Sequence, residues 1–144
     1  MKQAMNMQRT IAAALLMGTL AISFCPRAYA GGDPTGAWQV EDKSAIVQIA
    51  ACGPALCGNI IWSEKPTDAK GEKLCNMAVL GDALATGPDS WDKGWVYAPK
   101  AGSKYPVSLK LAADGTLHLH ITAGLFGRDQ VWTRPMVKVA PCAP

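Results

Sequence analysis

Two short stretches in the second half of the chain alternate apolar and polar residues with a period of two. In residues 105–111 a valine and two leucines share one face, and in residues 116–122 two leucines and an isoleucine do the same. Such alternation is typical of a β-strand that buries one face and exposes the other. Asp114-Gly115 lies between the two stretches and predicts a tight hairpin turn. The pattern therefore predicts antiparallel sheet with one buried face.

Similar runs, rich in β-branched and aromatic residues, recur along the chain, and none of them shows helical periodicity over ten residues. The strands expected from these runs cover residues 38–41, 45–51, 58–63, 95–97, 105–111, 116–122 and 129–134. Residues 64–92 are rich in Gly, Pro, Asp and Lys, which predicts a long irregular loop with one short helical turn at 77–84. Short strands joined by turns must protect their edges, and a closed meander does so best. We therefore expect an all-β fold, a small antiparallel up-and-down barrel of about seven to eight strands with one long irregular loop.

The first thirty residues have the organisation of a cleavable secretory signal. Lys2 and Arg9 precede a charge-free apolar run at 11–24, and Ala28-Tyr29-Ala30 follows it. The alternative is a membrane anchor, but a spanning helix needs about twenty apolar residues and this run is shorter. We expect cleavage after Ala30, a single domain over residues 31–144, no transmembrane segment after cleavage, and a location in the periplasm or outside the cell.

Cleavage after Ala30 would leave four cysteines, and an even number in an exported chain predicts disulfides. Cys52 and Cys57 flank a turn-like stretch between two strand candidates, so a hairpin would bring them within bridging distance. Cys75 would then pair with Cys142. The alternative, a four-cysteine zinc site, lacks the usual C-x-x-C spacing.

The charge balance of residues 31–144 argues against two classes of partner. This part of the chain carries eleven basic and eleven acidic residues, because Lys2, Arg9 and Arg27 belong to the predicted signal. A basic patch is the usual mark of a protein that binds nucleic acid or an anionic membrane surface. We therefore expect no nucleic-acid partner.

No catalytic motif is present in residues 31–144. The segment lacks G-x-S-x-G, H-E-x-x-H and G-x-G-x-x-G. His118 and His120 would share one strand face, as metal ligands can, but their threonine neighbours favour a solvated surface. We expect no enzyme activity, no cofactor and no metal site.

Two motifs at the ends of the predicted barrel resemble those of calycin barrels, the group that includes lipocalins. Gly36-Ala37-Trp38 begins the first strand and Arg134 ends the last, so that an arginine can stack on an indole and close the barrel floor. From Gly36 to Arg134 the chain is similar to a secreted bacterial family, domain of unknown function 2147. The resemblance implies a lipocalin-like barrel and export, with no activity attached. The chain departs from the family pattern at residues 74–81, where it lacks an arginine-containing run that the family usually carries.

The anchors of this family resemblance are four short motifs. They are Gly36-x-Trp38, residues 52–62 with both cysteines of the hairpin, residues 94–105, and the run from Leu125 to Arg134.

Several aromatic residues are candidates for lining the mouth of such a barrel. They are Trp91, Trp95, Tyr97, Tyr105 and Phe126. Aromatic side chains at a barrel mouth suit a small apolar ligand, although the same residues can instead fill a small core. The first functional hypothesis is therefore binding of a small hydrophobic molecule at the mouth. The alternative is a filled barrel that acts as a non-enzymatic interaction or structural module of the cell envelope, with the long loop as its contact.

Overall fold

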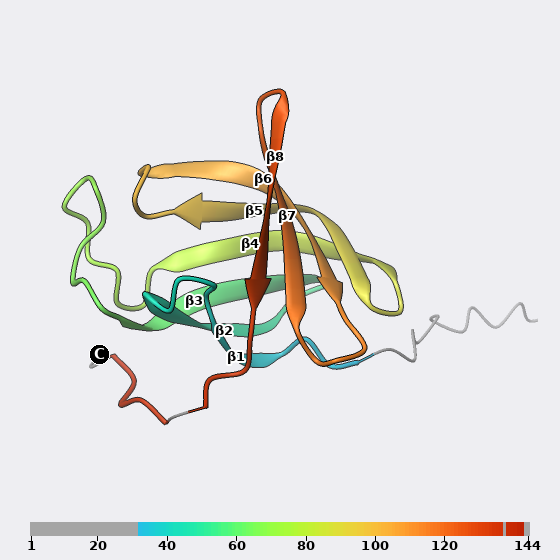
Figure 1. Cartoon of the computed structure of the whole chain (residues 1–144), viewed down its shortest axis with the longest axis horizontal. Coiled ribbons are helices and arrows are strands. Elements are labelled where there is room, and N and C mark those ends of the chain that lie inside the picture. The colour runs from blue at the N-terminus through green and yellow to red at the C-terminus, as the bar shows by residue number, and fades with distance from the viewer. Residues whose placement is uncertain (1–31, 137, 143–144) are drawn as a thin grey trace, which may run out of the picture.

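The computed structural model describes residues 32–136 and 138–142, so the predicted signal peptide lies outside the described part. These residues form eight β-strands and no helix (Figure 1). The strands are β1 Gly36–Gln39, β2 Ala45–Cys52, β3 Ala55–Ser63, β4 Ala78–Gly87, β5 Ser90–Ala98, β6 Ser103–Leu111, β7 Leu117–Ala123 and β8 Phe126–Trp132. The predicted all-β meander is confirmed.

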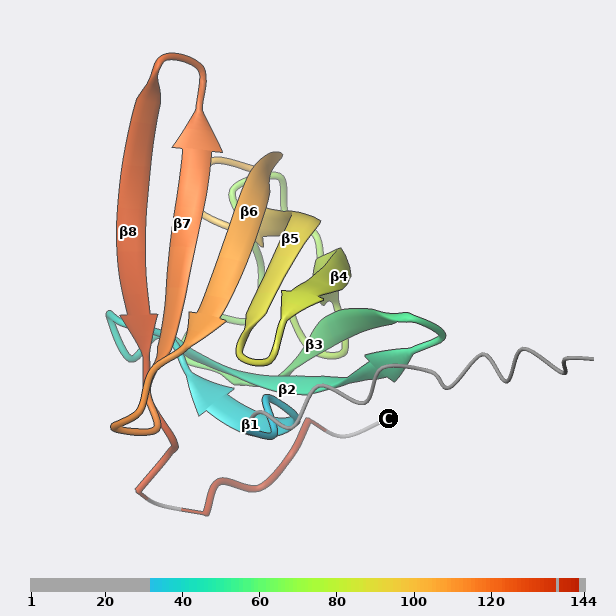
Figure 2. The ribbon, with the colours of Figure 1, turned by 90° about the vertical axis from the view of Figure 1, so that its right-hand side faces the viewer.

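The strands form one antiparallel sheet in sequence order, which curls strongly on itself (Figure 2). Its two edge strands meet at one point only, where Gln39 and Thr133 form an isolated bridge with backbone hydrogen bonds of 2.7 and 3.1 Å. Toward the β7–β8 turn, β8 stays paired with β7, but no described strand lies along its other edge. The expected closed barrel is therefore open along one side, because β1 is only four residues long and leaves β8 after this bridge.

The helical turn expected at 77–84 was wrong, because these residues begin strand β4. The segment looked helical because alanine and leucine dominate it and clean alternation is absent. Irregular register against β3, and a left-handed backbone at Asp82 (φ 56°), disturb the period of two. Pairing with β3 and β5 overrides local propensity here. The expected irregular loop shrinks accordingly to residues 64–77.

The interior of the curled sheet is packed with apolar side chains. The most deeply buried large ones come from five different strands and are Trp38, Ile46, Ile49, Ile60, Leu80, Leu117 and Leu119. The hairpin face predicted from alternation is inside, since Val107, Leu109, Leu117 and Leu119 all join this core. Among the described residues no buried polar side-chain atom lacks a hydrogen-bond partner. The body of the barrel is therefore filled by apolar side chains.

Arg134 and Trp38 close the floor of the barrel. The guanidinium carbon of Arg134 lies 3.8 Å from the centroid of the fully buried Trp38 ring. Its two terminal nitrogens donate to the backbone carbonyls of Thr35, Ala37 and Asp33 at 2.8, 3.2 and 3.0 Å. Gly36 permits this arrangement, because a Cβ atom there would lie 2.8 Å from the arginine Nη1 and its backbone has φ 104°.

The structure contains two disulfides, Cys52–Cys57 and Cys75–Cys142. The first closes the β2–β3 hairpin. The second fixes the C-terminal segment, which runs below β1 in Figure 2, to the loop before β4. Loop-closure entropy assigns about 4 kcal/mol to the long bridge and about 2 kcal/mol to the short one. The long bridge therefore contributes more to the stability of this small domain.

The floor contact gives a stability prediction. Replacing Arg134 with Met keeps a long apolar side chain but removes the cation–π contact and the carbonyl hydrogen bonds. We expect a loss of about 2–3 kcal/mol in the free energy of unfolding, measured by urea denaturation. Arg128→Met is the matched control, because no salt bridge or hydrogen bond of the Arg128 side chain occurs in the described structure. Equal stability of the two variants would contradict a structural role for the floor contact.

Candidate functional site

In an up-and-down sheet, alternate connections lie at the same end. The connections 40–44, 64–77, 99–102 and 124–125 therefore share the end opposite the Arg134 floor, which is the open end of the barrel. Three of them contact one another, and the fourth, the β7–β8 turn, stands apart (Figures 1 and 2). The candidate site is built from this rim.

An ion pair joins two turns of the rim. Lys100 donates to an oxygen of Asp42 at 2.6 Å. This hydrogen bond from Lys100, together with one from Ser44, lowers the pKa of Asp42 to about 2. Both side chains are largely exposed, so the pair contributes at most about 1 kcal/mol to stability. Its role is to fix the position of the rim.

The loop 64–77 is tied down across the sheet. Tyr97 on β5 donates its hydroxyl hydrogen to the carboxylate of Asp68, and the amide of Ala69 donates to the Pro99 carbonyl at 2.9 Å. Leu74 is buried in the core. The hydrogen bond to Asp68 raises the pKa of Tyr97 to about 12, and the same bond lowers the pKa of Asp68. A loop held in this way is poorly suited to wrap around a partner.

The five aromatic candidates do not converge on one site. The reason is a β-bulge in β5, where three steps from Trp91 to Gly94 face two steps on β6. The extra residue turns Trp91 into the core while Trp95 and Tyr97 point to the opposite face from the buried Val96. Trp91 is 8% exposed and lies near the β4–β5 turn, away from the open end.

Trp95 lies on the outer face in a contact of its own. Its indole packs on Gly81, where a Cβ atom would be 2.5 Å from the ring, and its N–H donates to Asp82 at 2.8 Å. The Lys104 ammonium covers the other side at 3.5 Å from a ring centroid. This tryptophan is fully engaged and forms no part of a mouth.

The two remaining candidates lie on the inner face, but apart. Tyr105 pairs with Val96 and is half-buried against the core. Phe126 begins β8 at the end of the β7–β8 hairpin and is 79% exposed. Only these two of the five candidates lie on the inner face near the open end.

The β7–β8 hairpin projects beyond the rest of the sheet (Figure 2). β6 pairs with β7 only as far as Ile121, so the last residues of the hairpin have no neighbouring strand on that side. The tip carries Leu125, 99% exposed, next to Phe126. Together the two side chains form an exposed apolar patch, and such patches are candidates for contact sites. We name residues 121–128 the projecting hairpin. Sequence reasoning noticed Phe126 but placed it at a barrel mouth.

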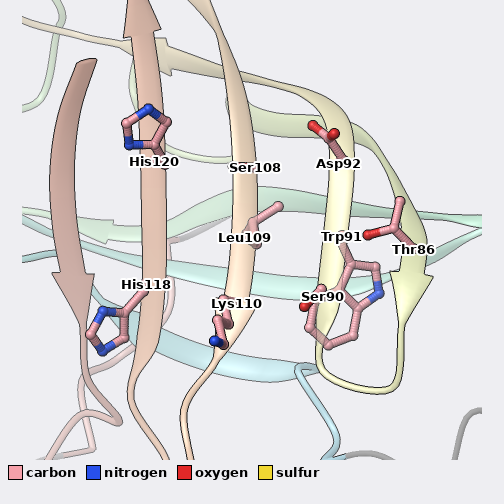
Figure 3. A pocket seen from close by; sticks show the side chains of 9 residues that line it. All are labelled: Thr86, Ser90, Trp91, Asp92, Ser108, Leu109, Lys110, His118 and His120. Atoms are coloured by element: carbon pink, nitrogen blue, oxygen red, sulfur yellow. The ribbon is translucent and has the colours of Figure 1, made fainter.

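Two hollows on the described structure are shallow and open. One, of about 340 Å³, lies over β4 to β7 and is lined by both histidines, Lys110 and the edge of Trp91 (Figure 3). The other, of about 430 Å³, lies beside the loop 64–77. Both are surface features, and neither replaces the packed interior.

Register aligns Ser108, His120 and Asp129 in one row across β6, β7 and β8. His120 Nδ1 lies 2.6 Å from an Asp129 oxygen, the geometry of a base held by a carboxylate. The rest of the ring, however, lies over β8: Cε1 and Nε2 would be 2.6 and 2.9 Å from a Cβ atom at Gly127. Nε2 therefore faces away from Ser108, so the row lacks the hydrogen bond that activates a serine.

Among the described residues, no three His, Cys, Asp or Glu side chains are grouped closely enough to hold a metal ion. Both histidines are on the exposed face, as alternation predicts. Across the described ranges, no helix is long and apolar enough to cross a membrane.

The curled meander with an arginine–tryptophan floor defines a lipocalin-like β-barrel. Its fold is similar to that of protein HP1028 from the human pathogen Helicobacter pylori, which is described as belonging to the lipocalin family. The TM-score is 0.58 at 20% identity, over 72% of this chain and 83% of that one. The chain belongs to the bacterial family described as "uncharacterized protein conserved in bacteria (DUF2147)", whose profile matches residues 36–134. Comparison with curated proteins gives no match.

The Asp68–Tyr97 hydrogen bond gives a prediction about pH. The pKa of Tyr97 is raised in the folded chain from 10.0 to about 12, so the hydrogen bond stabilises the fold fully below pH 10. This contribution to stability is lost as the pH rises through about 12. The pKa of Asp68 is lowered from 3.8, so its hydrogen bonds stabilise the fold above pH 3.8. This contribution to stability is lost as the pH falls below that value. In a Tyr105→Phe background, ultraviolet titration of the mature chain should show Tyr97 ionising near 12. Asp68→Asn should move that ionisation toward 10, and an unchanged titration would contradict the tether.

Proposed function

We propose that this protein is a non-enzymatic interaction module that works outside the cytoplasm, in the bacterial envelope, and that it contacts a partner protein through the projecting hairpin. The observation that carries the proposal is the contrast between the body of the barrel and its projecting hairpin. In the body, the inner face is filled by the core, whereas Leu125 and Phe126 are 99% and 79% exposed at the end of a projection. Two disulfides suit an oxidising compartment.

Among the residues that the structure describes, no reactive group is assembled, and this supports a non-enzymatic role. His120 and Asp129 form a pair on an exposed sheet surface, and the serine of the same row is not within reach of the free ring nitrogen. Exposed surfaces of this kind lack the desolvation that makes acid–base groups effective. The pair is better explained as a cross-strand contact that stiffens the hairpin.

A photo-crosslinking experiment tests the hairpin contact. A photoreactive residue at Phe126, in the exported protein in living cells, should give a discrete crosslinked partner. The same residue at Lys110, also exposed but outside the hairpin, should not. With the purified partner, the double variant Leu125→Ser and Phe126→Ser should bind at least about tenfold more weakly, since burying such side chains is worth about 1.5–3 kcal/mol each. Unchanged unfolding free energy is the control for fold, and unchanged affinity would refute the proposal.

A second candidate function is binding of a small hydrophobic molecule at the open end. It is favoured by Tyr105 and Ile121, which remain half-buried on the inner face next to the core. Native mass spectrometry of protein purified from the periplasm should then show a bound adduct, which Ile121→Asp should remove. Repeated absence of an adduct, with the hairpin contact intact, would leave only the interaction role.

A further inference from the structure

The free edge of β8 carries backbone groups with a fixed direction. In an antiparallel strand, every second residue points its N–H and C=O toward the same neighbour. Thr133 exchanges both hydrogen bonds with Gln39, so Val131, Asp129 and Gly127 point toward the same edge. The amide of Val131 is covered, because it donates to the Glu41 carboxylate at 3.3 Å. In the described structure, Asp129 and Gly127 have no backbone partner on that edge.

The position of β1 explains why this edge is open. β1 ends at Gln39, and the chain turns away into residues 40–44. A longer β1 would continue along β8 from Val131 to the tip of the hairpin. No strand of the described structure lies along this path. A strand entering there would run antiparallel to β8, in the same direction as β1, and would meet a template that is already aligned with the sheet (Figure 2).

The side chains along this edge define what such a strand must carry. Phe126 and Arg128 are on the inner face, whereas Gly127 and Asp129 are on the outer face. Arg128 is exposed, and within the described residues no carboxylate pairs with it. An entering strand would place one residue opposite each of these four. Charge complementarity then requires a basic residue opposite Asp129 and an acidic one opposite Arg128, with a large apolar residue opposite Phe126.

We propose that the β8 edge binds an extended segment of the partner protein by strand addition, antiparallel to β8, and that this segment carries a basic–acidic–any–apolar sequence. The inference rests on the proposed function and names the chemistry of its partner. Backbone hydrogen bonds to Asp129 and Gly127 supply affinity, and the side chains opposite Arg128 and Phe126 supply specificity.

A peptide tests the proposal on the mature, disulfide-bonded chain. The probe is Thr-Val-Lys-Glu-Thr-Phe-Thr, blocked at both ends, and the control peptide exchanges its Lys and Glu. Binding of the probe should slow amide hydrogen exchange of Gly127 and Asp129 by about tenfold or more, as expected when edge amides become hydrogen-bonded. The control peptide should bind about tenfold more weakly, because it places like charges together. No protection of these two amides at saturating probe would overturn strand addition.

Two variants separate backbone from side-chain contributions. Asp129→Pro removes an edge N–H that makes no bond to β7, a substitution that edge strands accept. Asp129→Asn keeps that N–H and removes the charge. The probe should bind the asparagine variant and lose binding to the proline variant. Equal binding to both would overturn the proposal. Should the proline variant misfold, the double variant Arg128→Glu with Asp129→Lys decides, because it exchanges both charges of the edge and should therefore bind the control peptide better than the probe.

The two proposals fail differently. If Leu125→Ser with Phe126→Ser releases the envelope partner while Asp129→Pro and Arg128→Glu retain it, the tip is a contact and strand addition is wrong. If the partner binds every hairpin variant equally, the proposed function itself is wrong.

Discussion

The contact of Arg134 with Trp38 is the constraint on which the rest of this structure depends. It joins the first strand to the residue after the last, and it places a guanidinium where it satisfies three carbonyls of the N-terminal segment. Without it, the sheet would have two distant edges. With it, the edges are pinned together at one end, where the Gln39–Thr133 bridge also forms.

The sheet is closed at one end only, and this explains the projecting hairpin at the other end. Strands β7 and β8 extend beyond the pairing available on their other edges, since β1 has four residues and bridges β8 only at Thr133, and β6 pairs with β7 only as far as Ile121. The excess length becomes a two-stranded projection with free edges. An isolated hairpin is marginally stable in water. Here the cross-strand His120–Asp129 contact and the attachment to the core at Leu117 and Leu119 hold it in place.

The fold was largely predictable because its signals are local. Alternation located the β6–β7 hairpin, its turn and its buried face, and cysteine spacing suggested the pairing found in the structure. Strand β4 was missed for a physical reason. Its alanine- and leucine-rich sequence has helical character, and only pairing on both sides makes it a strand. Such pairing is a long-range effect that no local pattern records.

The candidate site was less predictable, because it depends on one irregularity. Trp91 and Trp95 are four residues apart, so uninterrupted alternation would place both on the same face. The bulge between Trp91 and Gly94, with Lys93 at φ 61°, reverses the direction of the second. A single inserted residue therefore separates an apparent aromatic cluster into a core residue and an outer-face contact with Asp82 and Lys104.

The charges on β8 can be understood in the same terms as its geometry. Proteins commonly protect a free edge with charged side chains, which discourage indiscriminate strand pairing. β8 carries one charge of each sign at adjacent positions, Arg128 inside and Asp129 outside. In an antiparallel pairing of two identical β8 strands centred on Arg128 or on Asp129, that residue would face its own copy, which is unfavourable. A strand of complementary charge order meets no such barrier. The same two residues therefore disfavour self-association and allow one kind of partner strand, which is how specificity is obtained at an otherwise open edge.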